Sequence, residues 1–256
     1  MKNITLLITT LSILLSYYLC VLPHEWSHGL FAWIFGYKSS PFDIKYGGLL
    51  MLHCDENVPY DKILASGSGL QAAMIGIAGI TYNALMLLLS FVCLNKKRIR
   101  ESKIFHRFFY WFAVFNLCPI LGYIPNGTFS TQGDVGRFVS GLHISPWFVF
   151  IPGTLIVAYM VYNILAKKLY DLFEDLMIKH IMIHRLYLWF TIFILFFLLY
   201  THGYNPFSDH GASFLSKSIA AVSIIIAVVL TYVYDPKIGR LAPKHSVFQD
   251  KISDKR

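Results

Sequence analysis

Long apolar stretches, separated by short polar segments, make up most of the chain. A transmembrane helix needs about 20 mostly apolar residues. Six stretches approach or exceed this length, and they lie at 4–22, 63–94, 105–124, 144–165, 183–201 and 214–234. The pattern therefore predicts an all-α integral membrane protein with about six transmembrane helices.

The amino-acid composition supports this class of protein. Hydrophobic residues make up 56% of the 256 residues and charged residues only 14%, whereas about 25% of a typical soluble domain is charged. So few charges could not cover the surface of a soluble protein, and the composition also excludes disorder and collagen. We expect residues 1–235 to form one helical domain in a lipid bilayer, followed by a basic, flexible tail at 236–256.

Two segments depart from a simple pattern of spans. The 63–94 stretch is too long for one straight span, and its first half is rich in Gly and Ala. Small residues let helix backbones approach closely in lipid, so this helix should be central, and either tilted or with a first turn outside the membrane. Residues 41–53 partly alternate and contain Gly47-Gly48. They predict a short membrane-associated β-hairpin, with an amphipathic connector as the alternative.

The distribution of basic residues predicts the orientation in the membrane. With six spans, both termini share one side, and that side would carry 17 of the 22 Lys and Arg. Cytoplasmic segments of membrane proteins are enriched in Lys and Arg, so we expect a multi-pass protein with both termini in the cytoplasm. In a membrane protein the net charge of +8 is not a nucleic-acid signal, and we expect no nucleic-acid partner.

One motif near the end of the first apolar stretch carries chemistry. Residues 24–28 read His24-Glu25-Trp26-Ser27-His28, an H-E-x-x-H sequence. On a helix, the two histidines lie on one face and can reach the same zinc ion. Glu25 can then lean over the metal and take a proton from its water. Chance would give such a motif about 0.006 times in a chain of this composition, so the motif predicts a functional zinc site.

A hydrolytic zinc site needs a third protein ligand and an open fourth position for water. Asp134 heads the predicted fourth span and, by the predicted topology, lies on the same side of the membrane as the H-E-x-x-H motif. Gly133 and Gly136 flank it and allow close backbone approach. Asp134 is therefore the predicted third ligand, with a helix N-cap role as the alternative. Acidic residues in the 36–62 loop are the next candidates.

These motifs resemble the site-2 protease family of intramembrane zinc metalloproteases. The resemblance covers residues 20–138, about half of the chain. Its elements are the H-E-x-x-H motif, the hairpin segment at 42–48, the small-residue segment at 65–69, and Asn116-Leu117-Cys118-Pro119 followed by Gly133-Asp134. Ser27 stands where the family commonly has glycine.

The resemblance implies a zinc-dependent endopeptidase that cleaves a transmembrane segment of another membrane protein. His24, His28 and Asp134 would then bind Zn²⁺, Glu25 would be the general base, and Asn116 would help to hold the substrate strand. Two other functions stay open. One is a zinc hydrolase of a small or lipid-linked substrate, and the other is a non-enzymatic scaffold or transporter that keeps the motif. Glu25 favours an enzyme, because metal binding alone does not need it.

Overall fold

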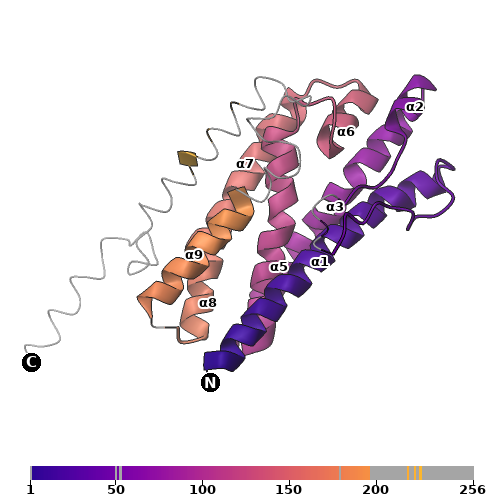
Figure 1. Ribbon diagram of the computed structural model, residues 1–256. Helices are drawn as coiled ribbons and strands as arrows, with labels where there is room; N and C mark the ends of the chain where they lie inside the picture. Colours follow the sequence, from indigo (N-terminus) through magenta and orange to yellow (C-terminus); the bar gives the residue numbers. More distant parts are fainter. Residues whose placement is uncertain are drawn as a thin grey trace, which may run out of the picture.

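The computed structural model describes residues 2–49, 51, 54–178 and 180–196, together with the isolated positions 218, 222, 225 and 226. These residues fold as helices joined by short connections, as predicted, with no β-strand among them (Figure 1). The elements are α1 (Lys2–Ile34), α2 (Tyr60–Ala65), α3 (Gly69–Leu94), α4 (Lys97–Arg100), α5 (Lys103–Leu121), the π-helix η1 (Gly122–Asn126), α6 (Asp134–Leu142), α7 (Trp147–Asn163), the π-helix η2 (Ile164–Lys168), α8 (Leu169–Asp175) and α9 (Ile181–Phe196).

Three long helices, α1, α3 and α5, pack against one another and form the centre of the bundle. The short helix α6 packs on α3, and α9 packs along α5 (Figure 1). The start of α1 also meets α9, where Thr9 Oγ1 lies 3.0 Å from the hydroxyl of Tyr187. Apolar side chains from these helices and from η2 and α8 form one buried core, which includes Tyr110, Trp111, Leu117, Ile164, Leu169 and Leu188. The Gly- and Ala-rich helix is central, as its composition predicts.

Helix α1 continues through Pro23, where the sequence suggested that the first span ends. Proline has no N–H, so the carbonyl of Leu19 loses its usual partner inside the helix. The hydroxyl of Tyr82 on α3 donates to that carbonyl over 2.6 Å. One turn further on, Ser27 Oγ donates to the carbonyl of Pro23 over 2.6 Å. The bond from Tyr82 replaces the one that the proline removes, and the helix continues to Ile34.

Four described helices are long and apolar enough to cross a membrane, and they lie at Ile4–Ile34, Gly69–Leu94, Lys103–Asn126 and Trp147–Asp175. This supports a membrane protein, but it does not support six spans. The predicted fifth span begins as α9, whose described part is shorter than a full span. The predicted sixth span and the tail at 236–256 lie outside the described residues, apart from a few isolated positions.

The predicted β-hairpin is not supported by the described residues of the loop at 36–59. The only strand-like pairing among the described residues of this loop is a single antiparallel bridge, in which the backbones of Lys45 and Asp55 exchange two hydrogen bonds of 2.9 Å. Side chains hold other loop carbonyls instead: Lys38 Nζ donates to those of Asp43 and Glu56, and Tyr18 on α1 donates to that of Leu49. Carbonyls bonded to side chains no longer need a partner strand, so the pairing stops at one bridge.

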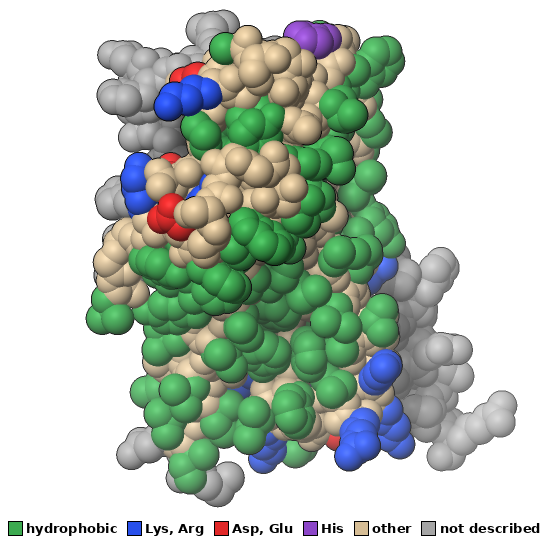
Figure 2. All heavy atoms as spheres, turned by 90° about the vertical axis from the view of Figure 1, so that its right-hand side faces the viewer, with side chains coloured by type: hydrophobic (Ala, Val, Ile, Leu, Met, Phe, Trp, Pro, Cys, Tyr) green, Lys and Arg blue, Asp and Glu red, His purple; other side chains and the backbone are tan. Residues whose placement is uncertain are grey.

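Basic residues gather at one end of the bundle. Figure 2 shows an apolar band around the middle of the visible face, with Lys and Arg side chains clustered below it. Helix α4, whose sequence is Lys-Arg-Ile-Arg, lies at this end beside the start of α1 (Figure 1). Arg100 of α4 connects this end of the bundle to α8, because its guanidinium donates two hydrogen bonds, of 2.6 and 2.8 Å, to the carboxylate of Asp175 at the end of α8. The opposite end of the bundle carries α2, α6 and the 36–59 loop.

Helix α6 lies so close to α3 that their backbones touch at two glycines. A Cβ atom on Gly141 would stand 2.4 Å from the carbonyl oxygen of Gly69, and one on Gly69 would stand 2.5 Å from that of Gly141. Seven residues along each helix, a Cβ on Gly76 would lie 3.0 Å from the carbonyl oxygen of Asp134. The small residues of α3 therefore decide how closely α6 approaches.

Gly141→Ala should destabilise the protein, because its methyl group meets rigid backbone atoms and forces α6 away from α3. Overpacking of this kind costs about 1–3 kcal/mol, more than the ~1 kcal/mol that alanine adds to helix propensity. Thermal unfolding in detergent should show a lower midpoint. Ser140→Ala, on the next residue, is the control and should unfold like wild type. Equal midpoints for the two variants would show that the glycine contact does not limit the packing.

Candidate metal centre

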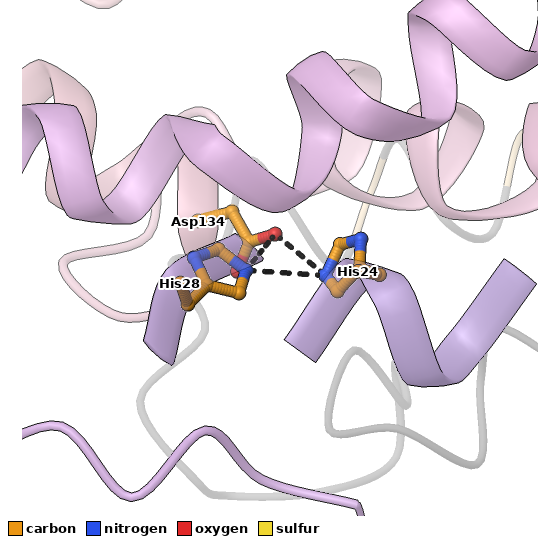
Figure 3. Close-up of side chains that lie close together, drawn as sticks. All are labelled: His24, His28 and Asp134. Atoms are coloured by element: carbon orange, nitrogen blue, oxygen red, sulfur yellow. Dashed lines mark hydrogen bonds and ion pairs between the residues drawn. The ribbon is translucent and has the colours of Figure 1, made fainter. Parts of the chain in front are cut away.

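His24, His28 and Asp134 meet inside the bundle, as Figure 3 shows. The two histidines lie one turn apart on α1, and their Nε2 atoms are 3.3 Å apart. The Oδ2 atom of Asp134 lies 3.1 Å from Nε2 of His24 and 3.3 Å from Nε2 of His28. All three side chains are buried. The structure therefore brings together the three residues that the sequence predicts as metal ligands.

Asp134 reaches the histidines from the first turn of α6. The chain enters this helix through Gly133, whose φ of 78° favours glycine. Gly136 then lets the helix pack against the preceding turn, because a Cβ there would stand 2.2 Å from the carbonyl oxygen of Ser130. Asp134 is the first residue of this short helix. The sequence-based prediction that Asp134 heads the fourth span is therefore wrong, because α7 is a separate helix that begins at Trp147. A left-handed residue, His143, ends α6 before α7 begins.

In each histidine, the ring nitrogen that points away from Asp134, Nδ1, forms a hydrogen bond to α3. Nδ1 of His28 donates to the backbone carbonyl of Ile75 on α3 over 2.6 Å. Nδ1 of His24 donates to Oδ1 of Asn83, also on α3, over 2.5 Å. Both rings therefore turn Nε2 toward Asp134. Such outer hydrogen bonds usually fix the tautomer and the ring orientation of metal-binding histidines.

The atoms that converge here fit a metal ion. Oδ2 of Asp134 is buried and has no hydrogen-bond partner in the described structure. Two neutral imidazole nitrogens and a carboxylate oxygen would repel one another unless a cation lay between them. Neutral imidazole and carboxylate are ligands that suit zinc.

Gly79 on α3 forms one wall of the site. A Cβ on Gly79 would stand 2.4 Å from Nε2 of His28 and 2.7 Å from Nε2 of His24. Zinc lies about 2.0–2.1 Å from a histidine nitrogen, so a side chain here would compete with an ion for the same space. Only glycine leaves both nitrogens accessible.

The site lies within two of the helices that are long and apolar enough to cross a membrane. His24 precedes the end of α1 by ten residues, and Gly79 follows the start of α3 by ten residues. At about 1.5 Å of rise per residue, both helices place the site about 15 Å from the end of the bundle opposite α4. Ionisable groups at such depth are costly and usually functional.

Glu25 and Asn116 have different surroundings. Glu25 is half-buried, and it makes no hydrogen bond or ion pair with a described residue. It is close enough to His24, Glu56 and Asp134 to interact electrostatically. Asn116, by contrast, is fully buried and bonded to Asn83 and to the carbonyl of Phe112. The carboxylate of Glu25 is thus free for chemistry, whereas the amide of Asn116 is engaged within the protein.

A partly buried ion pair fixes α6 beside the site. Arg137 Nη1 donates to Glu56 Oε1 over 2.7 Å, and its guanidinium lies 3.7 Å from the centre of the Tyr60 ring. Burial would lower the pKa of Arg137, but Glu56 raises it above its ordinary value, so the group stays charged. Arg137 and Asp134 are three residues apart and are neighbours on the helix surface. The pair therefore ties the rotation of α6, and with it Asp134, to the 36–59 loop and α2.

Sequence reasoning missed two residues of this site, Asn83 and Gly79. A signal existed for Asn83, because an amide in the middle of an apolar helix needs a hydrogen-bond partner. Gly79 was one of several small residues on the same helix, and nothing in the sequence separates it from Gly76. Their roles follow from which face of α3 meets α1.

No family model, curated protein or solved structure matches the chain.

Gly79→Ala should remove metal binding, because its methyl group would push the two imidazoles out of their present positions. The added methyl group would stand where both Nε2 atoms must approach an ion, so zinc retained by the purified protein should fall to near zero. Metal analysis of the protein in detergent measures this. Thr81→Ala, on the exposed face of α3, is the control and should keep the wild-type zinc content. A zinc content equal to wild type in Gly79→Ala would place the metal elsewhere.

Proposed function

We propose that the protein is a zinc-dependent intramembrane endopeptidase that cleaves a transmembrane segment of another membrane protein. The observation that supports this most is the meeting of His24, His28 and Asp134 inside an apolar bundle, with the unpaired carboxylate of Glu25 beside them. Hydrolysis of a peptide bond needs a metal-ligand set, a base and an open position for water. The first two are present in this chain at membrane depth.

Nε2 of His24, Nε2 of His28 and Oδ2 of Asp134 would hold the zinc ion. When bound, zinc would act as a Lewis acid that lowers the pKa of water and polarises a peptide carbonyl. The anionic ligand offsets part of the charge of the ion, which would be costly to leave uncompensated in the membrane. Three protein ligands would leave a fourth position for water or substrate.

Glu25 would move the proton. Its carboxylate has no described hydrogen-bond partner that would compete, and it follows a ligand directly in sequence. One carboxylate oxygen would accept a proton from the attacking water, and the same group would deliver it to the amide nitrogen of the departing strand. Transfer of this kind by a positioned side chain typically contributes about 10²–10⁴-fold to the rate.

The depth of the site favours a substrate that lies in the membrane. A peptide bond in a lipid-embedded helix is hydrogen-bonded and dry, so cleavage needs local unwinding and access for water. The 36–59 loop supplies polar groups at this depth. The carbonyl of Leu49 in this loop accepts a hydrogen bond from Tyr18 on α1. Tyr18 precedes His24 by six residues, which places it about 9 Å deeper in the bundle than His24. An unwound substrate strand and water would approach Glu25 along this loop.

The basic end of the bundle would face the cytoplasm. The start of α1, α4 and the end of α8 share that end (Figure 1), and the Lys and Arg cluster seen there follows the positive-inside pattern. We propose a multi-pass protein with cytoplasmic termini. The metal centre then lies nearer the opposite face of the membrane.

Glu25→Gln should abolish proteolysis and keep zinc. The amide preserves the size of the side chain but cannot accept a proton from water, so activity should fall at least about 10²-fold. Mass spectrometry would compare the new N-termini within transmembrane segments in membranes of cells that produce wild type or the variant. Glu101→Gln, an exposed acid near α4, is the matched control and should cleave like wild type. Peptides that appear equally with Glu25→Gln would contradict the proposed base.

The orientation can be tested independently of activity. A reporter active only outside the cytoplasm should be inactive when fused after Lys97 and active when fused after Thr128. A cytoplasmic reporter at the same two positions should give the reverse pattern. The opposite assignment in both reporters would invert the topology and place the metal centre nearer the cytoplasm.

A further inference from the structure

A chain of hydrogen bonds between buried amides connects His24 to the backbone of α5. Asn83 Oδ1 accepts from Nδ1 of His24 over 2.5 Å, and Asn83 Nδ2 donates to Asn116 Oδ1 over 3.0 Å. Asn116 Nδ2 then donates to the backbone carbonyl of Phe112 over 2.8 Å. Asn83 and Asn116 are both 0% exposed. Water does not reach these bonds, so they have to be satisfied within the protein.

The direction of this chain is fixed at its far end. A backbone carbonyl can only accept, so Asn116 must turn its NH₂ group toward Phe112 and its oxygen toward Asn83. Asn83 must then turn its NH₂ group toward Asn116, which leaves its oxygen for His24. That oxygen can only accept, so Nδ1 of His24 carries the hydrogen. In a neutral imidazole the other nitrogen, Nε2, then keeps its lone pair.

A second contact of Asn83 agrees with this direction. Its Nδ2 atom also lies 3.3 Å from Sγ of Cys20. The Cys20 thiol in turn donates to the carbonyl of Phe115 over 3.2 Å, so its sulfur faces Asn83 as an acceptor. Both hydrogens of the Asn83 amide therefore have an acceptor, and a flipped amide would lose them. His28 needs no such chain, because the carbonyl of Ile75 accepts from its Nδ1 directly.

We infer that Asn83 and Asn116 are positioning residues that hold His24 in the tautomer needed to bind the metal. Asn116 acts on His24 through Asn83 and does not contact the substrate, since its oxygen and nitrogen are both bonded inside the bundle. The inference rests on the proposed metal centre. It assigns a role to Asn83 and a different role to Asn116 from the one that the sequence resemblance implies.

Zinc affinity of the purified full-length protein, measured by competition with a chelator, tests the inference. Asn83→Leu leaves Nδ1 of His24 without an acceptor, and Asn116→Leu frees the Asn83 amide to flip. Both variants should bind zinc about 10–100-fold more weakly, the usual loss when such an outer partner is removed. Asn83→Asp keeps an acceptor for His24 but loses the donor to Asn116, so it should bind zinc more tightly than Asn83→Leu.

Asn163 on α7 provides a matched control. It is 8% exposed, and its Nδ2 donates to the carbonyl four residues earlier, that of Tyr159, over 2.8 Å. Asn116 makes the same local bond, but Asn163 has no link to His24. Asn163→Leu should therefore bind zinc like wild type. Nitrogen-15 NMR of the histidine rings adds a readout that general loss of stability would not change: the Nδ1–H signal of His24 should be present in wild type and reduced in Asn116→Leu.

Two results would overturn the inference. One is wild-type zinc affinity in Asn116→Leu together with a raised KM, which would return Asn116 to the substrate. The other is an equal loss of affinity in Asn163→Leu, which would show that any buried amide matters. A wild-type protein that binds no zinc would overturn the proposed function together with this inference. A wild-type protein that has the expected zinc affinities but cleaves no transmembrane segment would overturn only the proposed function.

Discussion

Three hydrogen-bond acceptors crowded into an apolar interior set the main constraint on this structure. The Nε2 atoms of two histidines and one carboxylate oxygen lie within 3.3 Å of one another. Such a group needs positive charge among its atoms, from a bound cation or from a proton on an imidazole. The surrounding bonds fix its geometry: Ile75 and Asn83 hold the histidines, and Arg137 with Glu56 holds the helix that carries Asp134.

Helix α3 allows these atoms to come so close together because it has glycines where it contacts α6 and the two histidines. Along one face it meets the backbone of α6 at Gly69 and Gly76, and at Gly79 it meets the two histidines. The same helix carries Tyr82 and Asn83, whose polar groups bond to Leu19 and to His24 on α1. Small residues set the distance between helices, and the two polar side chains set their register. In lipid, where apolar burial gives little drive for association, both contributions count.

The polar loop at 36–59 matters because of the depth of the site. An apolar bundle would seal a metal centre that lies about 15 Å from its end. Here the loop lies along α1 as far as Tyr18 and contributes Glu56 to the pair with Arg137. The loop therefore brings hydrogen-bonding groups near the half-buried Glu25. Through Glu56 and Arg137 it also fixes the helix that carries Asp134. The same segment would link substrate access to the geometry of the metal centre.

The sequence by itself determined the membrane class, the approximate positions of four long apolar helices and the residues of the candidate metal centre. These features are local: hydrophobic length and the i, i+4 spacing of His24 and His28 depend only on nearby residues. The tertiary structure decided what depends on distant contacts. Tyr82 bonds to the carbonyl that Pro23 leaves without a partner, and α1 continues. Asp134 lies on a separate short helix. In the described part of the 36–59 loop, a single bridge forms in place of the predicted hairpin. Gly79 and Asn83 acquire their roles only because one face of α3 meets α1, and no local pattern encodes that choice of face.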